Sequence, residues 1–436
     1  MSSEIELAID SCSSSWDLTL DHGKIEKETY WKSWGHYIAS YWSNAHQENL
    51  KERLMTLLCE EKDPLLREKI GAIATFCKKA WFYGVRTEAP ETLLMVKEGK
   101  MTFPGQITPV MENGRYRNYP GEDLWKQFWE TQYLLFVGAR DPVTRLKNLE
   151  ETYRVPPEVI SRNESLDPRI TWIGHASLLI QVAGINILTD PSFDFVFPCF
   201  KRHIPPGIAK EKLPCIDLLL NSHNHGDHAN QMDYFSRFNP LVFSGVNNGK
   251  WLKGMGFTHF VENDWWEKTV VSRKGQPIKI TAVPAQHGSQ TALMDANKML
   301  WCGYVLEVGD KVLYFAGDTA MGTKMYDKEG KEHALFEQLK SRFPKIDVAF
   351  LPIAPEGEPL VHIDHEEAIK AFKILGAKEI VPIHWGAYRT GKEAIEDPIL
   401  AFTAFARKEG IADQLRVLKV GESYTLRDEQ GIKQTA

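Results

Sequence analysis

The feature that most constrains the fold of this chain is a cluster of metal-binding residue types in the segment Ser222–His228, which reads SHNHGDH. Its pattern, H-x-H-x-D-H, places three imidazoles and one carboxylate within six residues. Such a group is hard to stabilise without a cation, and these side chains are common ligands of divalent transition metals. The cluster directly follows the apolar run Ile216–Leu220. The sequence therefore predicts a metal site in a loop at the end of a β-strand.

Three further candidate ligands, His287, Asp318 and His384, each follow a short apolar run that is typical of a buried strand. Rigid scaffolds place functional groups in such strand-end loops, so these residues are expected beside the first cluster. Five histidines and two aspartates are enough for two adjacent metal ions bridged by one carboxylate. The alternative is that each residue is an ordinary loop residue satisfied by hydrogen bonds. The apolar runs are Ile278–Val283, Val312–Phe315 and Ile380–Ile383.

The part of the chain before these motifs has a different pattern. Residues 1–150 have apolar side chains at helical spacing and contain seven of the 13 tryptophans. Core packing is the preferred explanation of these aromatic residues, and a lipid-facing or partner-facing surface around Trp81 is the alternative. We expect a helical N-terminal region of unknown role at 1–150 and a second domain at 165–436, separated by a proline-marked connector. The predicted helices are Lys24–His46, one that opens at Asp63-Pro64, and Gly121–Leu149.

The second region has the pattern of an α/β domain. Short apolar β-runs alternate with helical patterns such as His365–Leu375 and Pro398–Glu409. One stretch, Ile170–Thr189, contains no charged residue. We interpret it as two β-runs joined at Ala183-Gly184, because it carries a histidine, a glutamine, an asparagine and several hydroxyls. A membrane-spanning segment is the alternative interpretation of this stretch.

Charge and cysteine content bear on partners and compartment. The 52 basic and 58 acidic residues give a formal net charge of -6, which argues against a dedicated nucleic-acid binder. The six cysteines form no C-x-x-C pair, which favours reduced thiols and a cytoplasmic protein. No secretory signal is expected, because the first residues carry acidic side chains and no basic ones. Any contact with a membrane would be peripheral and local, through aromatic residues of the N-terminal region.

Taken with their order along the chain, these motifs resemble those of the metallo-β-lactamase fold, and more closely the N-acyl-phosphatidylethanolamine phospholipase D family. The resemblance extends from about Asp167 to Leu426 and does not include residues 1–150. It implies an α/β fold, an αββα sandwich, in which two sheets pack face to face and helices cover their outer faces. The matching segments are Thr171–Ala176, Leu188–Pro191, Ser222–His228, Asp264–Trp266, Ala316–Thr319, Val361–Asp364, Ile383–Gly386 and Val420–Ser423.

The resemblance also implies roles for individual residues. A first metal would be held by His223, His225 and His287. A second would be held by Asp227, His228 and His384, and Asp318 would bridge the two. Two zinc ions suit this donor set best, with manganese or iron as alternatives. Asp227 and His362 are the residues expected to take part in catalysis, with His362 protonating a leaving alkoxide or holding a phosphate oxygen.

Two more residues are expected near the site. Asp190 is predicted to orient a ligand histidine through its free ring N–H, the alternative being a turn residue before Pro191. His175 is expected near the metals, the alternative being a bond to a backbone carbonyl. The chain departs from the family in the loop Pro352–Leu360, where glutamates replace aromatic and arginine residues, and in Ser192–Lys212.

The resulting hypothesis is a dinuclear metal-dependent hydrolase, a phosphodiesterase of phospholipase D type acting on N-acyl-phosphatidylethanolamine-like lipids. A lactonase or esterase of the same fold, acting on a sugar phosphate or an acyl substrate, is the alternative within enzymes. A noncatalytic metal-binding interaction protein is the alternative of another class. A phospholipid or other phosphodiester is the expected partner, nucleic acid is not, and a homo-oligomer is left open.

Overall fold

A computed structural model describes most of the chain beyond residue 92. The chain divides into two units, 1–89 and 90–436. The helices predicted within 1–92 and most of Gly121–Leu149 lie outside the described residues, as does the surface around Trp81. The described residues are 93–120, 122, 148–156, 162–196, 202–291, 295–357 and 360–427.

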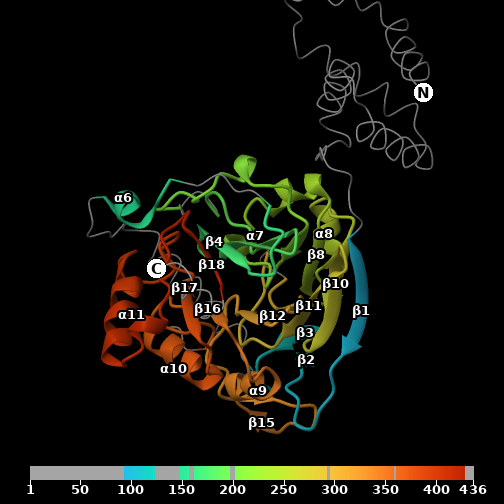
Figure 1. The fold of residues 1–436 in the computed structure, drawn as a ribbon. Helices are drawn as coiled ribbons and strands as arrows, with labels where there is room; N and C mark the ends of the chain where they lie inside the picture. The colour runs from blue at the N-terminus through green and yellow to red at the C-terminus, as the bar shows by residue number, and fades with distance from the viewer. Residues whose placement is uncertain are drawn as a thin grey trace, which may run out of the picture. The chain divides into compact units, whose positions relative to one another are not determined.

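Two seven-stranded mixed sheets form the centre of this unit (Figure 1). The first sheet runs in the order β1 (Leu94–Lys100), β10 (Glu267–Arg273), β11 (Gln276–Val283), β12 (Gly303–Val308), β13 (Lys311–Phe315), β16 (Val348–Pro352) and β17 (Glu379–Ile383). The second runs in the order β18 (Ser423–Thr425), β4 (Arg169–Gly174), β5 (Ser177–Val182), β6 (Ile185–Thr189), β7 (Leu218–Leu220), β8 (Leu241–Gly245) and β9 (Phe260–Asn263). In the first sheet β13, β16 and β17 are parallel and the other pairs are antiparallel. In the second sheet β6 to β9 are parallel and the other pairs are antiparallel.

Helices cover the outer faces of the two sheets, which makes an αββα sandwich. On one side α10 (His365–Leu375) packs against β16 and against its neighbours α9 (Leu335–Arg342) and α11 (Asp397–Lys408). Asp364 caps α10 and Glu367 completes the capping box, as expected for a helix beginning at His365. The remaining elements are α6 (Leu149–Tyr153), α7 (Gly226–Ala229), α8 (Gly249–Gly254), the hairpins β2 (Val110–Glu112) with β3 (Arg115–Arg117) and β14 (Met325–Tyr326) with β15 (Glu332–His333), and 3-10 helices at Lys210–Lys212, Met232–Phe238 and Ala412–Gln414.

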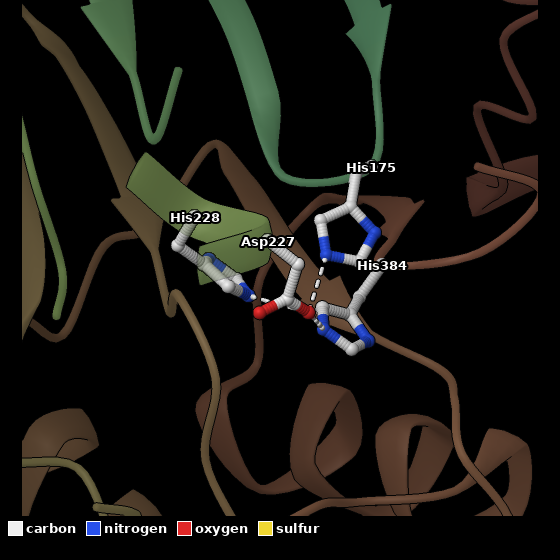
Figure 2. A group of neighbouring side chains, drawn as sticks. All are labelled: His175, Asp227, His228 and His384. Carbon is white, nitrogen blue, oxygen red and sulfur yellow. Dashed lines mark hydrogen bonds and ion pairs between the residues drawn. The ribbon is translucent and has the colours of Figure 1, made fainter. Parts of the chain in front are cut away.

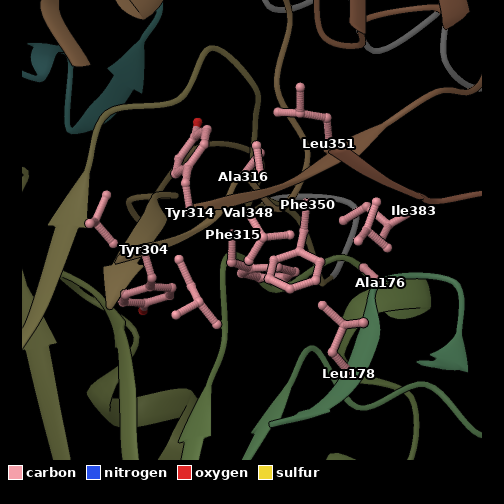
Figure 3. Close-up of a cluster of buried hydrophobic side chains, with 14 of the residues drawn as sticks. Ala176, Leu178, Tyr304, Tyr314, Phe315, Ala316, Val348, Phe350, Leu351 and Ile383 are labelled. Carbon is pink, nitrogen blue, oxygen red and sulfur yellow. The ribbon is translucent and has the colours of Figure 1, made fainter. Parts of the chain in front are cut away.

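The charge-free stretch 170–189 lies between two cores. In β5, Leu178 and Ile180 join the core between the sheets, where Leu178 faces Phe350 and Ile383 (Figure 3). Leu179 points the other way, into a second apolar cluster beneath the 3-10 helix at 232–238 and α8. A strand buried on both faces tolerates no charge, which explains the composition. None of the helices in the described part of the chain is long and apolar enough to cross a membrane.

Two sequence expectations need correction. The run Ile170–Val182 is not one strand, because the chain turns at His175 and forms the pair β4 and β5. Likewise residues 94–117 are not helical, since they form β1, β2 and β3. β1 pairs along β10 and supplies the partner that this strand would otherwise lack on that side. The sheet that carries the site therefore begins well before residue 165.

A buried ion-pair network ties the two sheets together. Asp217, which precedes β7, lies 3.0 Å from Arg162 Nη1 and 3.3 Å from Arg273 Nη2, and Arg273 belongs to β10 of the other sheet. Asp217 also accepts a hydrogen bond from the Asn186 backbone at 2.9 Å. Replacing Asp217 with alanine would leave the guanidinium of Arg273 buried without its carboxylate. We expect the free energy of unfolding to fall by about 3–5 kcal/mol, measured by urea denaturation.

The matched control for this prediction is an exposed pair nearby. Lys274 and Glu164 are 3.3 Å apart, with about half of each side chain exposed. Glu164→Ala is expected to change stability by less than about 1 kcal/mol. Equal effects of the two substitutions would show that the buried network does not hold the sheets together.

Candidate metal centre

All seven predicted ligands meet at one edge of the sandwich. His223 and His225 follow β7, and Asp227 and His228 lie on the short helix α7. The other three follow β11, β13 and β17, as the strand-end argument expects. Five of the seven are almost completely buried, and His225 and Asp227 are partly exposed. The buried residues are His223, His228, His287, Asp318 and His384.

Three histidines form the first group of the centre. Ring nitrogens of His223, His225 and His287 lie at the corners of a triangle with edges of 2.9, 3.1 and 3.2 Å. Nitrogens bound at about 2.0–2.1 Å to a tetrahedral zinc ion lie about 3.3 Å apart, so this triangle has the size that one ion needs.

The protonation of these rings also fits a cation. His287 donates through Nδ1 to the Val361 carbonyl at 2.8 Å, and His223 Nδ1 lies 2.8 Å from the Ser222 hydroxyl, which donates to Asp190. Burial lowers the pKa of His287 to about 3, and neighbouring histidines add to this effect, so the ring is neutral at neutral pH. Nε2 of both rings therefore carries a lone pair directed into the group. Two such acceptors 3.2 Å apart cannot bond to each other, whereas both can bind one cation.

Figure 2 shows the second group, in which the rings of His175, His228 and His384 surround Asp227. Asp227 Oδ2 lies 3.9 Å from His228 Nε2 and 3.7 Å from His384 Nε2.

Asp318 lies between the two groups. Its Oδ2 is 3.0 Å from Nε2 of both His228 and His384, and 3.7 Å from His287 Nε2. One carboxylate thus faces ligand atoms of both groups.

The electrostatics of the second group favour positive charge. Burial by itself would lower the pKa of His384, but Asp318 and Asp227 outweigh it and raise this pKa to about 9. The same balance raises the pKa of His228 well above its usual value. Burial would raise the pKa of Asp318, yet His228 and His384 hold it well below its usual range. Two ionised carboxylates thus stabilise a cation at this point.

Asp190 supports one ligand from each group. Its carboxylate accepts from His228 Nδ1 at 2.8 Å, from the Ser222 backbone at 2.7 Å and from the Ser222 hydroxyl at 2.6 Å. Through Ser222 it also reaches His223. The carboxylate is completely buried, so these contacts are its means of stabilisation and fix the orientation of both rings.

The other two predicted residues each lie beside an aspartate of the centre, His175 beside Asp227 and His362 beside Asp318. His175 Nε2 is 3.2 Å from Asp227 Oδ2, and burial lowers the pKa of His175 to about 3. A neutral His175 therefore donates to Asp227 and orients it. His362 is 12% exposed, with Nδ1 3.8 Å from Asp318 Oδ2. His362 therefore lies beside Asp318 and is partly accessible to solvent.

The backbone takes unusual conformations at these turns. His175, Asp190 and His384 have φ values of 56°, 28° and 62°, in the left-handed region that non-glycine residues rarely adopt. Gly317 has φ of 61°, and a Cβ there would lie 2.4 Å from Ser222 Cβ. Strain of this kind gathers at functional sites, where the surrounding structure holds it.

Sequence reasoning missed three residues of this neighbourhood. Ser222 lies inside the motif, but its hydroxyl was given no role. Tyr388 packs edge-on against His175 with ring centroids 5.0 Å apart. Its position four residues after the predicted ligand His384 was the sequence signal that could have indicated a place near the centre. Asn118 contacts the backbone of His287 from a region that no motif marks. Trp265 and Trp266, from the matching segment Asp264–Trp266, are buried packing residues.

Comparisons with known proteins find relatives of part of the chain. A beta-lactamase superfamily domain matches residues 185–385. The chain is 32% identical over 242 residues to the N-acyl-phosphatidylethanolamine-hydrolyzing phospholipase D 1 of Caenorhabditis elegans, a match covering 51% of this chain and 64% of that protein. It is 30% identical over 284 residues to the mitochondrial N-acyl-phosphatidylethanolamine-hydrolyzing phospholipase D of Saccharomyces cerevisiae, covering 61% and 58%. The chain therefore matches less than two thirds of each relative.

Among solved structures, the chain is similar to Igni18, a metallo hydrolase from the archaeon Ignicoccus hospitalis. The two are 21% identical with a TM-score of 0.46, over 60% of this chain and all of that one.

Proposed function

We propose that the chain, whose residues 185–385 match a beta-lactamase superfamily domain, is a dinuclear metal-dependent hydrolase that cleaves the phosphodiester of N-acyl-phosphatidylethanolamine-like lipids. One observation carries the metal-dependent part of the proposal. Asp318 Oδ2 lies 3.0 Å from Nε2 of both His228 and His384 and also faces His287. A single carboxylate shared in this way is the arrangement that bridges two ions.

The residues divide into two ligand sets in this proposal. His223, His225 and His287 hold one ion, whereas Asp227, His228 and His384 hold the other, and Asp318 is common to both. Two bound ions supply a nucleophilic hydroxide at neutral pH and stabilise the charge that develops on phosphorus. The imidazole and carboxylate donors favour zinc, with manganese or iron as alternatives.

The remaining side chains orient this set and meet the substrate. His175 holds the carboxylate of Asp227 by donating from Nε2, and Asp190 holds His228 by accepting from Nδ1. His362 lies beside Asp318 and is 12% exposed, and in this proposal its imidazole gives a proton to the leaving alkoxide or holds a phosphate oxygen. The substrate class rests on the two phospholipase D relatives at about 30% identity.

Two exposed apolar side chains lie on loops that also carry residues of the centre. Phe195, on the loop that follows β6, and Leu360, two residues before His362, are about half exposed. Glu356 of the divergent loop lies 3.1 Å from His365, and this loop replaces the aromatic and arginine residues of the lipid-cleaving family. The divergence is the reason to test lactones and acyl esters beside phospholipids.

The decisive experiment measures metal content and activity on the same preparation. Two equivalents of metal are expected, with activity on N-acylated glycerophospholipids that is lost on chelation and restored by zinc. Ordinary glycerophospholipids, lactones and acyl esters complete the panel. Activity in metal-free protein would contradict the proposal, hydrolysis of lactones alone would favour the alternative enzyme, and metal binding without any turnover would favour an interaction protein.

His362→Gln tests the residue that we place at the substrate side. Because general acid catalysis typically contributes about 10²–10⁴-fold, kcat is expected to fall by that factor while metal content stays unchanged. His365→Gln is the matched control, since His365 begins α10 and contacts Glu356 rather than the centre. If both variants keep the parent kcat, His362 has no part in the reaction.

A further inference from the structure

The hairpin β2–β3 and the residues after it lie outside the matched domain at 185–385, yet they touch one of its metal-binding residues. Sequence patterns assigned this segment to a separate N-terminal region. In the structure it reaches the loop that follows β11, where His287 lies. The contact is made by Asn118, which is 2% exposed.

Asn118 holds the main chain of His287 at two points. The His287 backbone N–H donates to Asn118 Oδ1 at 3.0 Å, and Asn118 Nδ2 donates to the His287 carbonyl at 2.8 Å. The side-chain amide thus pairs with this peptide as a neighbouring strand would. The backbone N–H and the backbone carbonyl of His287, whose imidazole is the ligand, are therefore both hydrogen-bonded.

Glu122 sets the orientation of the Asn118 amide. Glu122 Oε1 accepts from Asn118 Nδ2 and Oε2 accepts from the Asn118 backbone N–H, both at 2.8 Å. Since a carboxylate cannot donate, Nδ2 must face Glu122, and Oδ1 must face the His287 N–H. Burial raises the pKa of Glu122, although the bonds from Asn118 oppose the rise. Both oxygens of this buried carboxylate are thus bonded to Asn118.

A second tie holds the far end of the same loop. The Tyr116 backbone N–H donates to the Asn297 carbonyl at 2.7 Å. Asn297 in turn donates from its backbone to the Ser289 carbonyl at 2.6 Å, and its Oδ1 accepts from the Ser289 N–H at 3.0 Å. The hairpin segment therefore holds the chain on both sides of the loop between His287 and Asn297.

We propose that Asn118, oriented by Glu122, is a positioning residue of the metal centre. It fixes the His287 backbone so that Nε2 stays within the triangle of edges 2.9–3.2 Å that it forms with His223 and His225. This inference rests on the metal centre of the proposed function. The ring has one anchor of its own, the Val361 carbonyl, so backbone freedom at 287 would move the ligand nitrogen. Ligand sites need positions held within about 0.5 Å.

The test compares Asn118→Ala with Asn163→Ala in the 436-residue chain. Asn163 makes a similar set of bonds far from the centre, to the backbone of Asp167, Gln181 and Ser165. Zinc affinity is measured by competition with a chelator, and cobalt-loaded protein gives the visible absorption spectrum of the site. Thermal unfolding of the metal-free proteins reports stability.

We expect Asn118→Ala to weaken one of the two zinc equivalents about 10- to 100-fold and to change the cobalt spectrum. Asn163→Ala should lower stability and leave both readouts unchanged. Glu122→Gln, which keeps the volume but removes one acceptor, should give a smaller loss of affinity in the same direction. It also provides the measurement if Asn118→Ala does not fold.

The outcomes separate this inference from the function it rests on. Two tight zinc equivalents and a parent-like spectrum in the Asn118 and Glu122 variants would overturn the positioning role while leaving the metal centre intact. A parent protein that binds no metal would overturn both. Equal losses of zinc affinity in the Asn118 and Asn163 variants would show that affinity follows the general stability of the protein. That result would also overturn the positioning role of Asn118.

Discussion

Replacing Asp318 with asparagine is expected to reduce turnover by about a thousandfold or more and to lower the metal content of the protein. The substitution keeps size and shape, so the surrounding packing is preserved. It removes the charge that faces His228 and His384 at 3.0 Å and His287 at 3.7 Å. Bound metal ions lower the activation free energy by several kcal/mol when they stabilise the charge of the transition state, and the shared carboxylate would hold them in place. Each 1.4 kcal/mol of activation free energy is a factor of about ten in rate.

The measurement pairs kcat with elemental analysis of the same sample. Asp310→Asn is a suitable control, because Asp310 is an exposed residue at the opposite end of β13, with 65% of its side chain accessible. It should leave both quantities as they are. An Asp318→Asn protein with full activity would contradict the bridging role and with it the dinuclear centre.

The second large effect is expected for Asp190→Asn. Asparagine tolerates the left-handed φ of 28° at this position, so the backbone can remain as it is. Its amide nitrogen, however, would face donors, because the carboxylate now accepts from His228 Nδ1 and from the Ser222 backbone and hydroxyl. At least one buried donor would lose its acceptor. We expect the free energy of unfolding to fall by about 2–5 kcal/mol and metal affinity to fall about 10- to 100-fold.

Urea denaturation and chelator competition measure the two parts of this effect separately. Asp194→Asn is the control, four residues further along the same loop, where the carboxylate bonds to Gln231 and to the Phe195 backbone. A change below about 1 kcal/mol is expected there. If Asp190→Asn matched that control in both measurements, the orientation of His228 would not depend on Asp190.

Much of the centre could be predicted because its residues follow apolar runs. His287, Asp318 and His384 each come within four residues of the end of a buried strand, and strands of one sheet end at a common edge. Helix α10 was likewise predicted from the helical pattern of its residues. These signals are local in the chain, so a single sequence carries them.

The missed parts depend on contacts that are distant in the chain. Asn118 and His287 are 169 residues apart, and neither their spacing nor their residue types indicate a contact. Similarly, the turn at His175 was read as part of one strand, because a residue at φ of 56° in an apolar run leaves no trace in composition. Periodicity reports which face of an element is buried, but not which element covers it.

Strand β1 has a consequence for where the folded unit can be cut. It shields the outer edge of β10 from Glu267 to Ser272, while Leu94 and Val96 are themselves about 60% exposed. Trp266 also depends on this segment, since its indole donates to the Ile107 carbonyl and packs edge-on against Phe103. A fragment beginning at residue 165 would expose the unpaired backbone N–H and carbonyl groups of β10 and leave the indole of Trp266 uncovered. An exposed strand edge of this kind promotes self-association, so we expect that fragment to aggregate under conditions in which a fragment that includes β1 remains in solution.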